Sequence, residues 1–283
     1  MTSLSASLVR GAVTSPFKRA GQPDATLPPG RLTRPGSPVA PGPLAAYARI
    51  CGFAESGPLP VTYPHVLAFP LTMRLMTGRA FPLPVLGLVH TWIEITPHRA
   101  VRPDEPLELT VYADGLTPHR RGTEVTMATE ARVDGELVWE SRSGYLSRHR
   151  QPAGHVPPPL PAPPAAEELP AITEWRLPGD LGRRYGAVSG DRNPIHLHPL
   201  TARLFGFPRA IAHGMWTVAR CLAEVGEAAE LRSVRAEFKA PVLLPATVTY
   251  AADPAGNAFA LRGAGGRVHL VGAVTRPGQG DMS

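Results

Sequence analysis

Alternating apolar and polar positions mark several strands in the first half of the chain. The segments at residues 105–116, 122–135 and 136–148 alternate with a period of two and are separated by turn residues, which is typical of antiparallel strands that bury one face. Ahead of them, residues 44–53 have the pattern of a short helix, and residues 64–76 form a longer apolar helix. The pattern therefore predicts helices first and strands after them.

The second half repeats this order. Residues 212–226 show an apolar helical pattern, and strand-like segments follow at residues 234–253, 257–266 and 267–277. One apolar helix followed by antiparallel strands predicts an α+β domain in which the sheet wraps the helix. The same order of elements in both halves indicates an internal duplication.

Proline-rich stretches set the domain boundaries. Residues 151–170, QPAGHVPPPLPAPPAAEELP, are too dense in proline for a helix or a central strand, so we interpret them as a semi-rigid spacer. Residues 1–40 are rich in Ser, Gly, Pro and Arg, which is typical of a flexible extension; a transit peptide shares this composition, but the Pro-rich part has no continuous amphipathic helix. Domains are therefore predicted at 41–150 and 171–283.

Charge and cysteine content narrow the function classes. Of the formal net charge of +6, residues 1–40 carry +4, from five basic residues less Asp24. No basic patch interleaved with aromatic residues follows, so nucleic-acid binding is not expected. No apolar run reaches the roughly 18 to 20 residues of a membrane span. Cys51 and Cys221 match no metal or redox spacing. We expect a soluble cytoplasmic protein without a metal site.

The candidate chemistry lies between Tyr185 and Met215. Ser189, Gly190 and Asp191 form turns readily, and Pro194 disfavours helix immediately before it. Asp191 and His196 are thus expected on one short, constrained loop, where a carboxylate and an imidazole can bind the same water, as general acid–base hydration requires. Asn193 cannot titrate, and we assign it to holding the loop through backbone hydrogen bonds.

A helix start is predicted directly after this loop. His213, Gly214 and Met215 open the apolar helix, and the first turn of a helix presents N–H groups without intrahelical partners and a partial positive charge. Gly214 leaves room for close approach. A carbonyl oxygen bound to the Gly214 N–H would be stabilised as it gained negative charge, as in an oxyanion hole. His213 is assigned to orienting the helix start.

These segments together carry a family resemblance. The run SGDRNPIH, then GF, AHGM and FKAPVLLPATV resembles the signature of the MaoC-like dehydratases, also called (R)-specific enoyl-CoA hydratases, which have the hot-dog fold. The resemblance covers residues 171–275. It implies reversible hydration of trans-2-enoyl thioesters of CoA or acyl carrier protein to (R)-3-hydroxyacyl thioesters in fatty acid metabolism, without an organic cofactor.

The resemblance also implies roles for single residues. Asp191 and His196 would activate the water, Gly214 would supply the oxyanion N–H, and Phe238 would line the acyl-thioester site, with Asn193 grouped among the substrate-binding residues. At His198 the sequence departs from the family, which usually has an acidic residue two positions after the catalytic histidine. We interpret that position as peripheral to the reaction.

The first half resembles the degenerate partner domain of double hot-dog hydratases. It has no D-x-N-P-x-H motif, and its helix opens with TYPHVLAFPL instead of AHGM. The resemblance implies a structural domain that completes a pseudo-dimer, so the chain would be a monomer or a homodimer. It also implies thioester contacts from His90 and Arg121. The other histidines, among them His65, are interpreted as ordinary core or surface residues.

Two other functions stay open from the sequence. An acyl-thioesterase is one, because the same fold hosts that chemistry and a fold does not fix a function. A non-catalytic subunit that binds acyl thioesters is the other. The Asp191 and His196 loop favours hydration over both.

Overall fold

The computed structural model describes residue 18, residues 25–150, residue 166 and residues 168–226 and 231–277. Most of the predicted extension and spacer therefore lie outside the described residues. No helix in the described ranges combines the length and the apolar composition that crossing a membrane requires.

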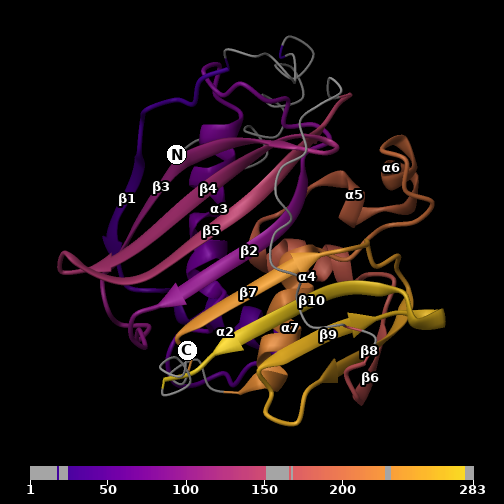
Figure 1. Ribbon diagram of the computed structural model, residues 1–283. Coiled ribbons are helices and arrows are strands. Elements are labelled where there is room, and N and C mark those ends of the chain that lie inside the picture. The colour runs from indigo at the N-terminus through magenta and orange to yellow at the C-terminus, as the bar shows by residue number, and fades with distance from the viewer. Residues whose placement is uncertain (1–17, 19–24, 151–165, 167, 227–230, 278–283) are drawn as a thin grey trace, which may run out of the picture.

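The described strands form one antiparallel sheet of ten, in the order β1-β3-β4-β5-β2-β7-β10-β9-β8-β6 (Figure 1). The first five are β1 (Leu32–Ser37), β2 (Val89–Pro97), β3 (Leu107–His119), β4 (Gly122–Val133) and β5 (Glu136–Arg148). The others are β6 (Ala171–Leu177), β7 (Ser233–Phe238), β8 (Ala246–Ala252), β9 (Ala258–Arg262) and β10 (Val268–Thr275).

The sheet order reveals the duplication predicted from the sequence. Counted outward from the middle of the sheet, the first half runs β2, β5, β4, β3, β1 and the second runs β7, β10, β9, β8, β6. Each half thus places its second strand innermost and its first strand at the edge. The halves join where β2 pairs with β7, from Trp92 opposite Glu237 to Ile95 opposite Val234. The α+β double hot-dog prediction is confirmed.

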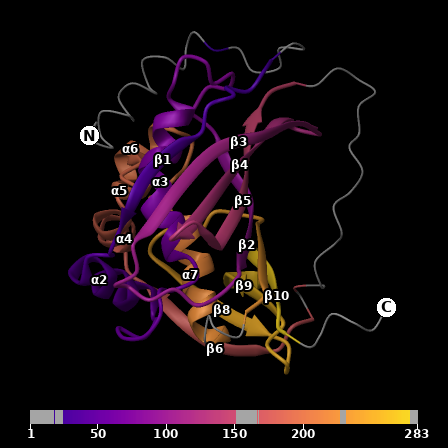
Figure 2. The same ribbon diagram turned by 90° about the vertical axis from the view of Figure 1, so that its left-hand side faces the viewer.

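The helices lie together on one face of this sheet (Figure 2). In the first half they are α2 (Pro41–Cys51) and α3 (Tyr63–Met76). In the second half they are α4 (Leu181–Ser189), α5 (Pro194–Leu197), α6 (Pro199–Leu204) and α7 (Gly214–Val225), and a short 3-10 turn (Ala264–Gly266) precedes β10. The predicted apolar helices at residues 64–76 and 212–226 correspond to α3 and α7, and both bury apolar residues in one continuous core.

Two strands that the alternation did not reveal form the edges of the sheet. β1 corrects the predicted boundary at residue 40, because residues 32–37 pair with β3 instead of belonging to a flexible extension. β6 pairs with β8 at the opposite edge. Both strands are largely exposed, so neither has the buried stripe that alternation detects. Pro35 is compatible with β1 because an edge strand needs hydrogen bonds on one side only.

Contacts between helices of the two halves complete the junction. Trp216 of α7 donates from its indole nitrogen to the Ile50 carbonyl oxygen at 2.9 Å, and the rings of Tyr47 and Tyr185 lie 6.1 Å apart. α2 thereby packs against α4 and α7. The C-terminus of α4 and the N-terminus of α7 are therefore held beside the seam between β2 and β7.

Candidate active site

The loop after α4 holds the first predicted catalytic residue. α4 ends at Ser189, and Gly190 caps it with a φ of 79°, a left-handed conformation that glycine adopts without steric cost. The Asp191 N–H donates to Ser189 Oγ at 3.2 Å, and the Asp191 carboxylate accepts from the Asn193 N–H at 3.1 Å. Asn193 Oδ1 in turn accepts from the Ile195 N–H at 3.4 Å and caps α5. The loop is thus fixed by local side-chain to backbone bonds.

Two glycines on one face of α4 bring this loop close to the helix. A Cβ atom on Gly182 would collide with the His196 carbonyl, and one on Gly186 would lie 2.7 Å from the Asp191 carbonyl oxygen. Because the two glycines are four residues apart, they share one side of α4. The main chain of both predicted catalytic residues therefore rests directly on the backbone of α4.

A main-chain carbonyl sets the tautomer of His196. His196 is buried, and its Nδ1 lies 2.8 Å from the Ile211 carbonyl oxygen. A carbonyl can only accept, so Nδ1 carries the proton and Nε2 of the neutral ring keeps its lone pair. Burial lowers the pKa of His196, although the charge of Asp191 opposes this shift. At neutral pH the ring is therefore a proton acceptor at Nε2.

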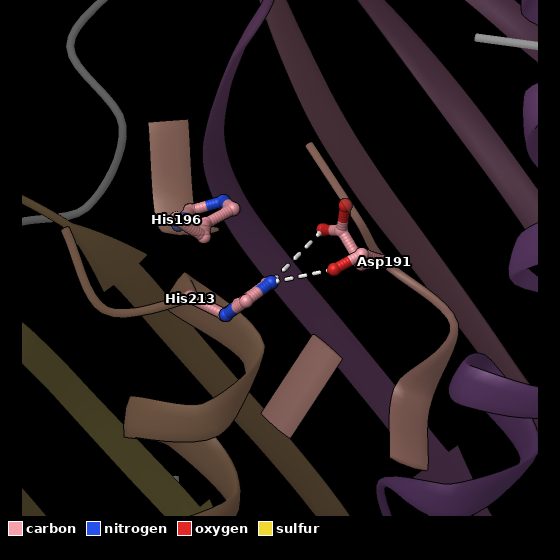
Figure 3. Close-up of side chains that lie close together, drawn as sticks. All are labelled: Asp191, His196 and His213. Atoms are coloured by element: carbon pink, nitrogen blue, oxygen red, sulfur yellow. Dashed lines mark hydrogen bonds and ion pairs between the residues drawn. The ribbon is translucent and has the colours of Figure 1, made fainter. Parts of the chain in front are cut away.

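His213 joins these two residues (Figure 3). Its ring stacks on that of His196 with centroids 3.7 Å apart, and its Nε2 donates to the Asp191 carbonyl oxygen at 2.9 Å. Nε2 also lies 3.8 Å from the Asp191 carboxylate. Burial lowers the pKa of His213 well below its usual value. The sequence analysis assigned this residue to the helix start; the structure places it between Asp191 and α7.

The spacing of Asp191, His196 and His213 is short enough for a metal ion, because one donor atom from each lies within 4.8 Å of the others. The nitrogens that face the Ile211 and Asp191 carbonyls carry the ring protons, and the other nitrogen of each ring keeps its lone pair. A histidine that ligates a metal usually donates its second N–H to such an acceptor, so these hydrogen bonds are compatible with a metal as well as with proton transfer between a carboxylate and an imidazole lone pair.

Gly214 and Phe238, which the sequence analysis assigned to the same site, are in contact. Gly214 is the first residue of α7, so its N–H has no partner within the helix. A Cβ atom at this position would lie 2.8 Å from Cε1 of Phe238. The Phe238 ring therefore packs against the main chain that carries the proposed oxyanion donor, and only glycine allows this approach.

The first half contributes a wall of aromatic rings to the same place. His90 of β2 lies 4.5 Å from the Tyr145 ring and 4.7 Å from the Phe238 ring, measured between centroids. His65 of α3 stacks on His90 at 6.1 Å. Burial lowers the pKa of His65 to about 4 and that of His90 to about 3. The charge of Asp191 acts on both His65 and Tyr145, so the site is composed of both halves.

The sequence analysis missed His65, although the duplication contained a signal for it. His65 is the third residue of α3, and α3 occupies in the first half the place that α7 occupies in the second. Aligning TYPH with AHGM would have placed His65 beside the helix start that mirrors Gly214. Its contact with the site is a consequence of this symmetry.

Two positions that the sequence analysis singled out are exposed. Arg121 is exposed in the turn between β3 and β4, where its main chain bonds to His119 and His149. His198 is also exposed, and its Nδ1 accepts from the Leu200 N–H at 3.2 Å as the N-cap of α6. An acidic side chain would accept the same bond, which explains how histidine replaces it here.

Comparison with known proteins places these features in a family. The family described as "MaoC like domain" matches residues 169–259. The chain is 39% identical to 3-hydroxyacyl-thioester dehydratase X of Mycobacterium tuberculosis over 223 residues, which are 78% of this chain and 79% of that protein. A crystal structure of HtdX from the same organism superposes with a TM-score of 0.73 at 36% identity, covering 87% of this chain and 100% of the other.

A more distant structure supports the fold alone. The MaoC-like dehydratase from Phytophthora capsici superposes with a TM-score of 0.72 at 19% identity, covering 90% of this chain and 98% of that one. The double hot-dog architecture is therefore retained even where the sequences have diverged widely.

Proposed function

This chain belongs to the MaoC-like dehydratase family and is a hydro-lyase acting on 3-hydroxyacyl thioesters in fatty acid metabolism, and we propose that Asp191 and His196 catalyse its reaction. In our proposal, water adds reversibly to a trans-2-enoyl thioester and gives the (R)-3-hydroxyacyl thioester. The observation that carries this assignment is the Nδ1 hydrogen bond of His196 to Ile211, which leaves the lone pair of the neutral ring on Nε2, in a residue with one ring nitrogen within 4.8 Å of an Asp191 carboxylate oxygen.

Two neighbouring acceptors orient the water. One O–H of the water donates to the Asp191 carboxylate and the other to His196 Nε2, which leaves an oxygen lone pair free to attack C3 of the substrate. As the new C–O bond forms, the C2–C3 π electrons move toward the thioester carbonyl. Asp191 takes a proton from the water, the proton passes to Nε2 of His196, and His196 delivers it to C2. The water and the enoyl thioester together supply every atom of the product.

The Gly214 N–H stabilises the enolate that forms on the way. It stands at the N-terminus of α7, where the helix dipole and an N–H without an intrahelical partner both favour negative charge. The thioester carbonyl oxygen binds there while Phe238 flanks the acyl-thioester group. Such donors stabilise the transition state more than the substrate, because the oxygen carries its full charge only after C3 has been attacked.

The first half holds the thioester, in our proposal, and supplies neither of the two residues that transfer the proton. His90 contacts Phe238 and so reaches the acyl-thioester site, whereas the exposed Arg121 would contact the carrier, either CoA or acyl carrier protein. Because one chain already contains two hot-dog domains, a monomer or a homodimer suffices. The free, buried thiols of Cys51 and Cys221 support a reducing, cytoplasmic location.

The experiment that tests this function follows the absorbance of the enoyl-thioester band when the protein is added to trans-2-enoyl-CoA substrates of increasing chain length. Thiol release is monitored in parallel. We expect the band to disappear without thiol release. Thiol release would indicate a thioesterase instead, and a stable band with tight binding would indicate a non-catalytic subunit. The stereochemistry of the product is then determined by chiral chromatography.

A further inference from the structure

His65 is a buried histidine with one ring nitrogen that has no hydrogen-bond partner among the described residues. It lies in the first turn of α3 with 6% of its surface exposed. This nitrogen is Nδ1, which is buried. An unpaired polar atom in the interior destabilises a protein, so a residue that only filled the core would be apolar here.

Ring contacts connect His65 to the proposed oxyanion site. His65 stacks on His90 with the ring planes 12° apart, and His90 contacts Phe238, which packs against Gly214. These contacts run from α3 across β2 and β7 to the start of α7. His65 therefore belongs to the wall of the same site, on the side contributed by the first half.

The charge state of His65 determines what it can offer. Burial lowers its pKa to about 4, while the charge of Asp191 acts in the opposite direction. At neutral pH the ring is neutral, and a neutral imidazole always carries one N–H donor and one acceptor. His65 thus brings a hydrogen-bond donor, without a net charge, to the side of the site on which the charge of Asp191 acts.

The proposed reaction can use such a donor. The water oxygen has two hydrogens, which Asp191 and His196 accept, and two lone pairs, of which one attacks C3. The second lone pair can accept a hydrogen bond, but neither the carboxylate nor His196 Nε2 can donate one at neutral pH. Asn193 caps α5 with its side-chain oxygen and keeps its side-chain NH2 as a donor on the loop. The 3-hydroxyl oxygen of the product has two lone pairs, so it can accept from Asn193 and from a second donor of the first half.

We propose that His65 is a positioning residue whose ring N–H donates a hydrogen bond to the oxygen that is added to, or removed from, C3 of the substrate. The inference rests on the proposed function and extends it by naming a contribution of the first half to the reaction. The same donor would bind the 3-hydroxyl oxygen of the product. His65 would therefore distinguish a 3-hydroxyacyl thioester from a saturated one.

A binding experiment tests this distinction without turnover. In the Asp191→Asn variant, the affinities for (R)-3-hydroxyoctanoyl-CoA and octanoyl-CoA are measured by calorimetry, with and without His65→Phe. We expect His65→Phe to weaken binding of the hydroxyacyl thioester about fivefold, the usual effect of one neutral hydrogen bond, and to leave binding of octanoyl-CoA within twofold. Either His65→Asn or His65→Gln, whose amides keep a donor, should restore the preference.

Other results would overturn the inference. Equal weakening for both ligands, or no weakening for either, would show that His65 does not bind the oxygen at C3. If the wild-type protein hydrates enoyl-CoA but His65→Phe keeps the preference, the inference alone fails. If the wild-type protein neither hydrates nor binds these thioesters, the proposed function fails and the inference fails with it.

Activity and stability together separate positioning from a structural role. In the wild-type background we expect His65→Phe to lower kcat about tenfold or more while Tm stays the same or rises, because the unpaired Nδ1 is removed. Thr72→Val is the matched control, since Thr72 is buried in the same helix and its hydroxyl donates to Ala68 within α3; it should keep full activity. A fall in Tm with full activity in His65→Phe would contradict the proposal.

Discussion

A single main-chain carbonyl sets the tautomer of His196. The Ile211 carbonyl accepts from Nδ1, so the lone pair of the neutral ring is fixed on Nε2. Burial keeps this neutral form populated by lowering the pKa. The D-x-N-P-x-H pattern identified the residue, but the carbonyl that sets its tautomer lies fifteen positions away and has no sequence signal.

The lowered pKa of His196 predicts the acid side of the pH profile. Protonated His196 cannot accept from water, so hydration is lost as the pH falls through the folded pKa, which lies below the usual 6.5. We expect kcat/KM for hydration to be constant from pH 8 down to about 6.5 and to fall only below it. A profile with its acid midpoint at or above 6.5 would be inconsistent with a neutral, buried His196.

Gly214 makes a second prediction at the residue scale. In Gly214→Ala the new Cβ atom would lie 2.8 Å from the Phe238 ring, so the ring or the helix start must shift and the N–H moves away from the thioester oxygen. We expect kcat to fall about 10²-fold, as when one oxyanion donor is removed. Gly42→Ala is the matched control, because a Cβ atom there meets no atom within 4 Å. Equal activity in the two variants would exclude the role of Gly214.

At the scale of single elements, prediction from the sequence succeeded where a helix or strand buries one apolar face. The helices α3 and α7 and the strands β3, β4 and β5 lie where apolar periodicity placed them. β1 and β6 were missed because edge strands expose both faces. α4 was also missed, because its close contact with the catalytic loop needs glycines, which are poor helix formers and conceal the helical pattern.

The packing of α4 against the loop is testable at Gly186. A Cβ atom there would lie 2.7 Å from the Asp191 carbonyl oxygen, and the backbone can relieve this contact only by moving. We expect Gly186→Ala to lower the free energy of unfolding by about 1–3 kcal/mol and to reduce kcat at least tenfold, as judged by denaturant titration and the enoyl-band assay. Gly42→Ala again serves as the control. Normal activity would show that the position of Asp191 tolerates a shift of its support.

At the scale of the whole molecule, one sheet joins two halves that contribute different residues to the site. The second half carries the D-x-N-P-x-H loop and α7, while the first half supplies His65, His90 and Tyr145 across the β2 and β7 seam. The duplication could be predicted because helices and strands recur in order. The wall built from both halves could not be predicted, because no local sequence pattern indicates which side chains of the first half face the seam.

The buried histidines of this wall make stability depend on pH. The folded pKa of His65, about 4, lies below its unfolded value of about 6.5, so the unfolded chain binds more protons between these values and stability falls as the pH falls. From pH 7 to pH 5, His65 should cost about 2 kcal/mol of unfolding free energy. We expect His65→Phe to reduce the pH 7 to 5 difference by about this amount in denaturant titrations. An unchanged difference would show that His65 is not held neutral.

The most direct measurement compares hydration by the wild-type protein with hydration by Asp191→Asn and His196→Ala. Asp180→Asn is the matched control, because Asp180 precedes α4 and its side chain makes no cap hydrogen bond. We expect both site variants to keep a cooperative thermal transition and to lose hydration by about 10² or more, while the control keeps its activity. If either folded site variant hydrated the enoyl thioester at the wild-type rate, Asp191 and His196 would not be the catalytic pair.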